Sequence, residues 1–337
     1  MFRLNTLLVP LTAMVLATTV AAQPASTEPV QSLSKGSAQG WPARAVRIIV
    51  PFIAGGTADT LGRIVAAKLS EAYGQSFIIE NRGGAGGTVG AEFVSKSAPD
   101  GYTLGVTGLG PLPVATAIAA KPPYDPVKGF AHVALFGGPP SVLAVHPSVP
   151  VKDLGQFIAL TKSQPGAINY GTAGNGSTGQ MLAELFKQRS GAHMQHIAYK
   201  GASGAVIDAI AGHIQAVSTT LTTTNAAMRA GRLRAIAISS AARLPDFPDV
   251  TFRESGYPDL VAAVWFSLSA PPATPTEIVA KLNADVRRIL HLAEVRERLR
   301  PEGIETNNLD PKAFTDFVAA EVRRWAPLVR ASGARHE

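Results

Sequence analysis

The sequence predicts an α/β protein of two lobes, each a mainly parallel sheet flanked by helices, joined by two crossings of the chain that act as hinges. Three observations lead to this prediction. The 337 residues suffice for two ordinary lobes. The composition is 46% hydrophobic but only 7% aromatic, which indicates the aliphatic core typical of helix-covered parallel sheets. Short β-branched runs alternate with helical patterns in two successive stretches of the chain.

The first 22 residues have the three-part pattern of a secretory signal. Arg3 supplies the positive start, residues 7–20 are apolar and uncharged, and residues 20–22 offer a cleavage site of small side chains. The apolar run is shorter than the ~20 residues that a membrane-spanning helix needs. We therefore expect export with cleavage near Ala22. Residues 23–40 are rich in Gln, Pro, Ser, Thr and Gly, which predicts a flexible leader.

Cysteine content and charge narrow the class further. The chain has no cysteine, so disulfides and a lipid anchor on an N-terminal Cys are excluded, and we expect a freely diffusing mature protein. The formal net charge is +7, but Lys and Arg are scattered in runs no longer than two and are not interleaved with aromatic residues. This predicts a solvated basic surface and no nucleic-acid partner.

The strand and helix patterns follow in order along the chain. In the first stretch, strands are expected at 47–52, 76–80 and 102–107 and helices at 57–73 and 88–97. In the second, strands are expected at 142–146, 168–172, 194–199 and 233–239 and helices at 151–163, 178–187 and 201–211. After a Pro-rich segment, a strand at 263–268 and two helices that begin near Thr274 and Pro311 return to cover the first sheet. The predicted limits are 41–141 and 263–337 for lobe 1 and 142–262 for lobe 2.

Three Gly-rich turns, at 51–59, 81–88 and 171–179, each lie between a predicted strand and helix. Gly lets the backbone approach a ligand closely, and a helix N-terminus offers free N–H groups and the positive end of a dipole. Each turn alone could be plain turn chemistry. Three of them at strand ends, where open α/β sheets bind ligands, favour an anion site.

Other kinds of site are disfavoured. Residues 174–179 match G-x-G-x-x-G, but the following strand ends at 196–200 without the carboxylate that a dinucleotide ribose needs. A G-x-S-x-G motif and a Cys nucleophile are missing. His193 and His196 would point to opposite faces of a strand. We therefore predict no enzymatic activity, no cofactor and no metal site.

Several short motifs occur in one order from about Trp41 to the C-terminus, at 47–52, 55–59, 80–82, 84–87, 99–104, 123–126, 184–187, 199–201 and 231–234. They resemble the Bug (TctC-like) substrate-binding proteins. This resemblance implies a periplasmic receptor of a tripartite tricarboxylate transporter (TTT) with the two-lobed periplasmic-binding-protein (Venus flytrap) fold. The implied partners are a small organic acid and the integral membrane subunits of the transporter, and we expect a monomer.

The resemblance also implies that backbone N–H groups and bridging waters of the turns hold the ligand carboxylate. The implied ligand-binding residues of the first lobe are Phe52, Gly55, Gly56, Thr57, Asp59, Gly84, Ala85, Gly86, Thr107 and Gly108. Those of the second lobe are Ala173, Gly174, Gly176, Ser177 and Thr219. For Asp59 there is an alternative, in which the carboxylate only caps its own helix.

Two departures from the family pattern bear on the ligand. Gln215, Thr219 and Thr220 occupy a strand that usually carries an acidic residue and an Asp-Asn pair, and Gln180 replaces a frequent His. Without these acids an ammonium group lacks a partner, which favours a di- or tricarboxylate or an aromatic acid. An acidic amino acid stays the alternative ligand.

We therefore predict a binding protein that captures its ligand by hinge closure, without turnover. A ligand-sensing receptor subunit for a sensor kinase is one rival, and an exported α/β enzyme is another. Normal uptake with a lost transcriptional response on deletion would identify the sensor, and loss of substrate the enzyme.

Overall fold

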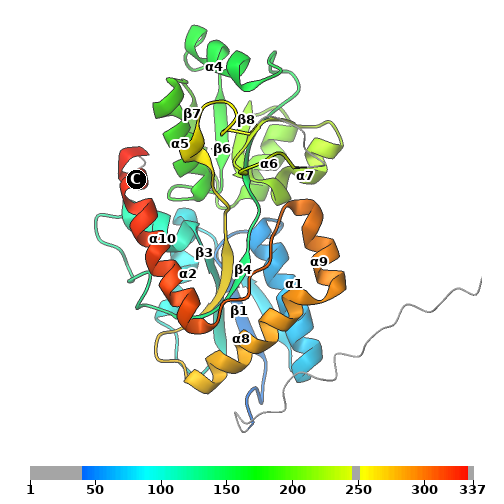
Figure 1. The fold of residues 1–337 in the computed structure, drawn as a ribbon, viewed down its shortest axis with the longest axis vertical. Coiled ribbons are helices and arrows are strands. Elements are labelled where there is room, and N and C mark those ends of the chain that lie inside the picture. Colours follow the sequence, from blue (N-terminus) through cyan, green and yellow to red (C-terminus); the bar gives the residue numbers. More distant parts are fainter. Residues whose placement is uncertain (1–39, 245–250, 333–337) are drawn as a thin grey trace, which may run out of the picture.

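Each of the two predicted lobes contains a five-stranded sheet in the structure, a computed structural model that describes residues 40–244 and 251–332 (Figure 1). The predicted signal peptide and almost all of the predicted leader lie outside the described residues. The two sheets lie one above the other along the long axis of the molecule, with helices on their faces. The prediction of a two-lobed α/β fold is therefore confirmed.

The sheet of the first lobe has the order β2-β1-β3-β10-β4. Its strands are β1 (Val46–Val50), β2 (Phe77–Asn81), β3 (Thr103–Gly108), β4 (Ala131–Gly137) and β10 (Phe266–Ala270). The helices of this lobe are α1 (Thr57–Tyr73), α2 (Thr88–Ser95), α3 (Ala115–Ile118), α8 (Thr276–His291), α9 (Ala293–Leu299) and α10 (Pro311–Ser332), with the short turns η1 (Ala85–Gly87), η2 (Gly110–Val114) and η4 (Arg300–Glu302). Strands β1, β2 and β3 are parallel, and β10 is antiparallel to both of its neighbours.

The sheet of the second lobe has the order β7-β6-β8-β5-β9. Its strands are β5 (Ser141–Val145), β6 (Asn169–Thr172), β7 (Gln195–Ala198), β8 (Ala216–Thr220) and β9 (Arg234–Ile238). Its helices are α4 (Leu154–Ser163), α5 (Thr178–Ser190), α6 (Ala202–Ile210) and α7 (Leu221–Arg229), with the short turn η3 (Pro258–Leu260). Here β5 is the strand that runs antiparallel to its neighbours.

The antiparallel strand of each sheet directly follows a chain crossing. Strand β4 leaves the first sheet and continues through residues 138–140 into β5, and the return crossing leads to β10. The two crossings lie side by side, because the Val264 amide donates to the Pro139 carbonyl at 2.8 Å and Pro140 forms a bridge with Ala263. These bridges show why the last strand of the first sheet begins at Phe266 instead of at the predicted residue 263.

Five helices and strands lie where the pattern gave no prediction, namely α3, β4, β8, α7 and α9. The residues of α7 are rich in Thr, which disfavours a helix by itself. Helix α7 packs against β5, β8 and β9 and buries Leu221 and Ala227. Tertiary packing therefore overrides the local preference.

The C-terminal helix α10 ties the two lobes together. It runs along one side of the molecule and ends beside α5 of the second lobe (Figure 1). Leu112 of η2, Leu185 of α5 and Trp325 of α10 belong to one buried hydrophobic cluster that extends through both lobes. Among the described residues, none of the helices combines the length and the apolarity required to span a bilayer.

Candidate functional site

A cavity lies where the turns of the two sheets meet. Its empty volume, which includes space open to solvent, is about 560 Å³. The first lobe lines it with Phe52, Gly56, Thr57, Ala58, Gly110 and Pro111. The second lobe contributes Ala173, Ser177, Thr178, Gly179 and Ala202, and a group of hydroxyl residues, Ser218, Thr219, Thr220 and Thr223. Ser141, Val264 and Phe266, next to the crossings, complete the lining.

Four helices begin at this cavity. Thr57, Thr178 and Ala202 are the first residues of α1, α5 and α6 and line it, and α7 begins directly after Thr220. The first N–H groups of a helix have no partner within it, and this end of the helix dipole is positive. In α1, α6 and α7 the residue before the helix does not cap these groups with its side chain. The cavity therefore gathers hydrogen-bond donors and positive potential, although the residues that line it are uncharged.

A triangle of hydroxyl groups joins the two lobes at the cavity wall. Thr57 Oγ1 of the first lobe lies 2.7 Å from Thr220 Oγ1 and 3.3 Å from Thr223 Oγ1 of the second. Thr220 and Thr223 are also within hydrogen-bond distance of each other, at 2.9 Å. These contacts place the start of α1 against the start of α7.

The Gly-rich turns of the two lobes touch one another beside the cavity. A Cβ atom at Gly86, whose φ is +61°, would lie only 2.5 Å from the Asn175 carbonyl oxygen. A Cβ atom at Gly83 would lie 2.6 Å from the Lys200 carbonyl oxygen. Only glycine permits this approach of backbone to backbone. These glycines thus serve the contact between the lobes.

Asp59 organises the first turn from within. It is buried and accepts hydrogen bonds from the Gly55 amide at 3.1 Å, Asn81 Nδ2 at 3.0 Å and Arg63 Nε at 2.9 Å. Burial by itself raises the pKa of the Asp59 carboxyl, but these hydrogen bonds outweigh it and hold the pKa below its ordinary value. Asp59 does not line the cavity, and its role in ligand binding or in capping its own helix stays a prediction.

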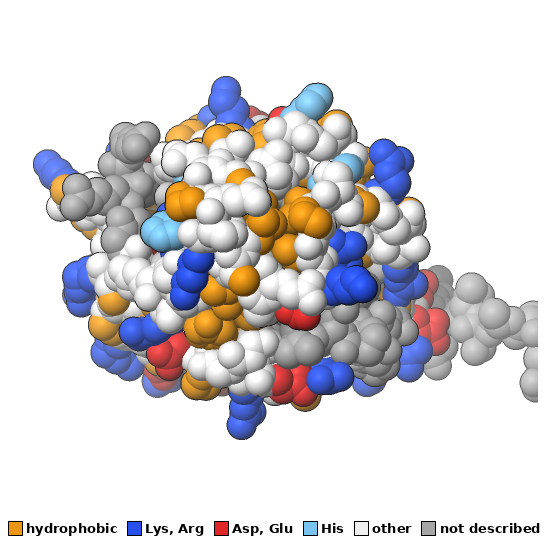
Figure 2. All heavy atoms as spheres, turned by 90° about the horizontal axis from the view of Figure 1, so that it is seen from above, with side chains coloured by type: hydrophobic (Ala, Val, Ile, Leu, Met, Phe, Trp, Pro, Cys, Tyr) orange, Lys and Arg blue, Asp and Glu red, His pale blue; other side chains and the backbone are white. Residues whose placement is uncertain are grey.

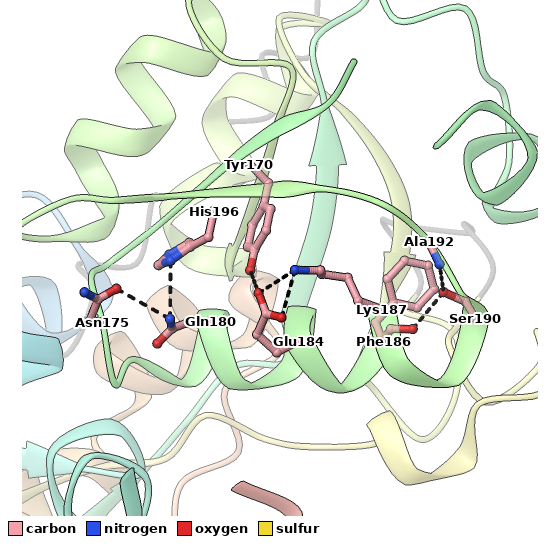
Figure 3. Close-up of polar contacts among 9 residues, drawn as sticks. All are labelled: Tyr170, Asn175, Gln180, Glu184, Phe186, Lys187, Ser190, Ala192 and His196. Atoms are coloured by element: carbon pink, nitrogen blue, oxygen red, sulfur yellow. Dashed lines mark hydrogen bonds and ion pairs between the residues drawn. The ribbon is translucent and has the colours of Figure 1, made fainter. Parts of the chain in front are cut away.

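A polar network behind α5 holds the third turn (Figure 3). Gln180 Oε1 accepts a hydrogen bond from the Gly176 amide at 2.7 Å, and Gln180 Nε2 lies 3.3 Å from His196 Nδ1. His196 Nε2 lies 2.7 Å from Thr172 Oγ1. Burial lowers the pKa of His196 to about 4, so the ring is neutral at neutral pH and its Nδ1 can accept from Gln180.

Further along α5, Glu184 accepts hydrogen bonds from Tyr170 Oη at 2.5 Å and from Lys187 Nζ at 2.8 and 3.0 Å (Figure 3). Tyr170 is a strand residue of β6, so these contacts fasten α5 to the sheet beneath it. The contact between Glu184 and Tyr170 therefore holds α5, and with it the first residues of the helix, in place at the cavity wall.

Six of the residues predicted to bind ligand line the cavity, namely Phe52, Gly56, Thr57, Ala173, Ser177 and Thr219. The others lie outside the lining. Gly86, Gly174 and Gly176 lie at the contact between turns, and Gly55, Gly84 and Ala85 lie within the first-lobe turns. Thr107 bonds Ser267 and Ser269 inside the first sheet, and Gly108 lies against the Trp265 carbonyl. A role of any of them in binding stays a prediction.

Sequence reasoning missed several lining residues. Thr178 lies within the third Gly-rich turn, at 171–179, so the same motif could have identified it. Ser141, Val264 and Phe266 come from the ends of the crossings, where no local motif marks a site. The lining residues at the Thr-rich start of α7 were not identified because the helix itself was not predicted.

Charge is dispersed on the outer face of the second lobe. Figure 2, which views the molecule from above the second lobe, shows Lys and Arg side chains separated by uncharged surface on this face. Within residues 40–244 and 251–332, His, Asp and Glu form no group of three that could hold a metal ion.

Comparison with known proteins gives consistent matches. Residues 61–334 match the family described as "Tripartite tricarboxylate transporter family receptor". The chain is 36% identical to protein BugT of Bordetella pertussis over 301 residues, which cover 89% of this chain and 92% of that protein.

Two solved structures have nearly the same fold. An R. palustris protein with adipate has a TM-score of 0.83 and 35% identity, covering 88% of this chain and 99% of its own. MatC from Rhodopseudomonas palustris with bound malate has a TM-score of 0.82 and 34% identity, covering 86% of this chain and all of its own.

Proposed function

This chain belongs to the tripartite tricarboxylate transporter receptor family, a family of substrate receptors and not of enzymes, and we propose that it captures a small carboxylate in the periplasm and delivers it to the membrane subunits of such a transporter. The signal-like N-terminus and the family support the location. The rival role as a sensor-kinase receptor stays a prediction.

The observation that carries this proposal is the convergence of four helix N-termini on one uncharged cavity. The Leu221 N–H of α7 donates to the Pro140 carbonyl at 2.9 Å and the Gln180 N–H of α5 to the Ser177 side chain, but the dipoles of the four helices and the other N–H groups of their first turns favour a bound anion without a charged side chain. The hydroxyls of Thr57, Thr220 and Thr223 add further hydrogen-bonding groups beside these N–H groups. A carboxylate fits this arrangement because its oxygens accept several hydrogen bonds.

The proposed ligand carries no amine. The cavity lining of hydroxyl, glycine and apolar residues offers hydrogen bonds but no negative charge to pair with an ammonium group. The two structural relatives named above were solved with adipate and malate, which are acids without an amine, and they support the same class for this chain.

We propose that ligand binding closes the two lobes about the paired crossings. One lobe comprises residues 41–141 and 263–337, and the other comprises residues 142–262. Helices α1 and α5–α7 come from different lobes, so a ligand between them contacts both. The triangle of Thr57, Thr220 and Thr223 and the bond from Ser203 Oγ to the Ala54 carbonyl, at 2.8 Å, then join the lobes around it.

The experiment is a thermal-shift screen of the mature protein against succinate, malate, adipate, citrate, benzoate and glutamate. A ligand present at 100 times its Kd adds about 3 kcal/mol to the free energy of unfolding. We expect stabilisation by at least one amine-free acid. If none of the acids raises the Tm, the proposal is wrong.

Gly56 provides the matched variants for this screen. Its φ is −90°, and a Cβ atom there would meet nothing within 4 Å, so a larger residue enters the cavity without strain. Gly56→Ala should weaken binding slightly and Gly56→Val should abolish it, while both keep the unfolding midpoint of the ligand-free protein. Wild-type affinity in Gly56→Val would contradict the placement of the site.

A further inference from the structure

A groove lies on the surface of the first lobe, between the edge strand β2 and the helix α2. We call it the β2–α2 groove, and its principal residues are Arg47, Ile78 and Arg82 from the sheet side and Val89, Phe93 and Lys96 from α2 and its C-terminal end. Arg47 of β1 and Ile78 of β2 are in register, so their side chains point to the same face of the sheet. The groove shares no lining residue with the ligand cavity and is therefore a separate surface.

Two aliphatic side chains expose apolar surface in this groove. The exposed fractions of Ile78 and Val89 are 50% and 49%, and these are two of the four large hydrophobic side chains that are exposed among the described residues. The groove around them is lined by four cationic and two acidic side chains. Exposed apolar surface with a charged rim is typical of a site that contacts another molecule.

The cations of the groove outnumber the acids that pair with them. Arg47 Nη1 lies 3.5 Å and Arg82 Nε lies 2.6 Å from the oxygens of a single carboxylate, that of Glu80. The other two cations of the lining each have an acid of their own. Arg82 also stacks on the ring of Phe93, 3.7 Å from its centre, which holds the guanidinium in a fixed orientation. Arg47 and Arg82 together therefore keep one positive charge for a further carboxylate.

The backbone of β2 is open to pairing at the edge of the sheet. The Ser76 carbonyl and the Arg82 amide, at the two ends of the strand, bond β1. Because successive residues of a strand point their backbone groups to opposite sides, those of Ile79 and Asn81 are directed away from the sheet. An extended segment can add to such an edge as a further strand, and its alternate side chains then lie beside Ile78.

We propose that the β2–α2 groove is the docking site for the membrane subunits of the transporter. The subunits contribute an extended segment that pairs with β2, with an acidic side chain for Arg47 and Arg82 and apolar side chains for Ile78 and Val89. This inference rests on the proposed function and names the surface through which the bound acid is delivered.

Two other occupants of the groove are less favourable. A second copy of this chain would bring the same excess of cations, so two such grooves repel each other. A lipid surface offers no strand to pair with the edge of β2. An acidic, extended protein segment satisfies both the charge and the backbone of the groove.

The first test measures uptake by cells in which the wild type or a variant is the only copy of this receptor. The probe is radiolabelled succinate, malate, adipate, citrate or benzoate, whichever the thermal-shift screen shows to bind. Ile78→Asp and Val89→Asp place a negative charge in the groove and leave the ligand cavity unchanged. We expect each to lower the uptake rate about 10-fold or more and to keep the wild-type Kd for the acid in calorimetry.

Val89 lies in the first turn of α2, where an acidic residue is favourable, so Val89→Asp carries the test if Ile78→Asp does not fold. Val89→Lys removes the same apolar contact but adds a positive charge. It should lower uptake less than Val89→Asp does, because the partner segment is acidic.

Ile207→Asp is the matched control. Ile207 of α6 is 64% exposed and lies outside the β2–α2 groove, so this variant should transport the acid at the wild-type rate. The chain contains no cysteine, so Ile78→Cys and Ile207→Cys each provide a single thiol for a photo-activated cross-linker in intact cells. We expect Ile78→Cys to give an adduct that mass spectrometry identifies as a membrane subunit of the transporter, and Ile207→Cys to give no such adduct.

The inference is wrong if the groove variants transport at the wild-type rate, if Ile207→Asp loses as much uptake as they do, or if Val89→Lys loses as much as Val89→Asp. A cross-link from Ile78→Cys to a second copy of this chain or to phospholipid, or no cross-link, would also overturn it. These results leave the capture of the acid standing. A wild type that binds no acid, or that binds one and does not support its uptake, would instead overturn the proposed function.

Discussion

Replacing Gly86 by alanine tests whether binding depends on the close approach of the two lobes. Gly86 belongs to the first lobe, and its Cβ position lies 2.5 Å from the Asn175 carbonyl oxygen and from the Gly176 carbonyl carbon of the second. The nearest atoms are backbone, so they cannot rotate away as a flexible side chain could. Gly86→Ala should therefore hold the lobes apart without disturbing the core of either.

The magnitude follows from two separate costs. Alanine at the φ of +61° costs roughly 1–2 kcal/mol of unfolding free energy, because left-handed backbone is strained by a Cβ atom. Crowding against the second lobe costs a further ~1–3 kcal/mol, but only when the lobes meet. This second cost raises the Kd by roughly 5- to 150-fold.

Gly74→Ala is the matched control. Its φ is +66° and a Cβ atom there meets nothing within 4 Å, so it shares the strain without the contact between lobes. Calorimetry with the acid found in the thermal-shift screen gives the Kd, and small-angle scattering compares the ligand-bound shapes. We expect Gly74→Ala to bind like the wild type and Gly86→Ala to bind weakly and stay extended. The reasoning is refuted if Gly86→Ala keeps wild-type affinity or if both variants lose it equally.

Two further predictions concern stability. Glu321 Oε2 accepts hydrogen bonds from the indole Nε1 of both Trp265 and Trp325 at 2.9 Å, so Glu321→Leu leaves two buried donors unpaired. We expect it to lower the free energy of unfolding in urea by about 2–6 kcal/mol, and Glu321→Gln to lower it less; equal midpoints for the two variants would contradict this role. Burial lowers the pKa of His132 and of His196 to about 4, below the 6.5 of an unburied histidine. Between these values the unfolded chain binds more protons, so stability is fully present above pH 6.5 and falls as the pH drops to about 4, by up to about 3 kcal/mol for each histidine. A urea midpoint that does not change from pH 7 to pH 4 would show that these rings are not buried as neutral groups.

Elements whose signals are local agree well between sequence and structure. The pattern predicted residues 57–73 as a helix, and these are the bounds of α1. The start of α5 at Thr178 was also predicted, and in the structure Ser177 caps this helix by accepting a hydrogen bond from the Gln180 amide at 3.3 Å. Turns and helix caps depend on residues that are only a few positions apart, so the sequence alone can predict them.

Elements that depend on distant partners were harder to predict. The strand β4 and the helix α7 have weak patterns of their own and are stabilised by packing against neighbours far away in the chain. Asp59 was predicted either to bind the ligand or to cap its own helix, and the structure shows its carboxylate bonded to Gly55, Arg63 and Asn81, which the sequence did not predict. A motif places a residue near a site and does not say which atoms it meets.

The sequence by itself determined that this protein carries Gly-rich helix starts on two α/β lobes, and hence that an anion is the ligand to expect. Those features rest on backbone geometry within single turns. Only the tertiary structure decided which donors share a cavity. Thr57 meets Thr220 across 163 positions of the chain, and Thr178 faces Gly110 of the other lobe. Contacts of this kind arise when the two sheets dock, and no pattern within either lobe encodes them.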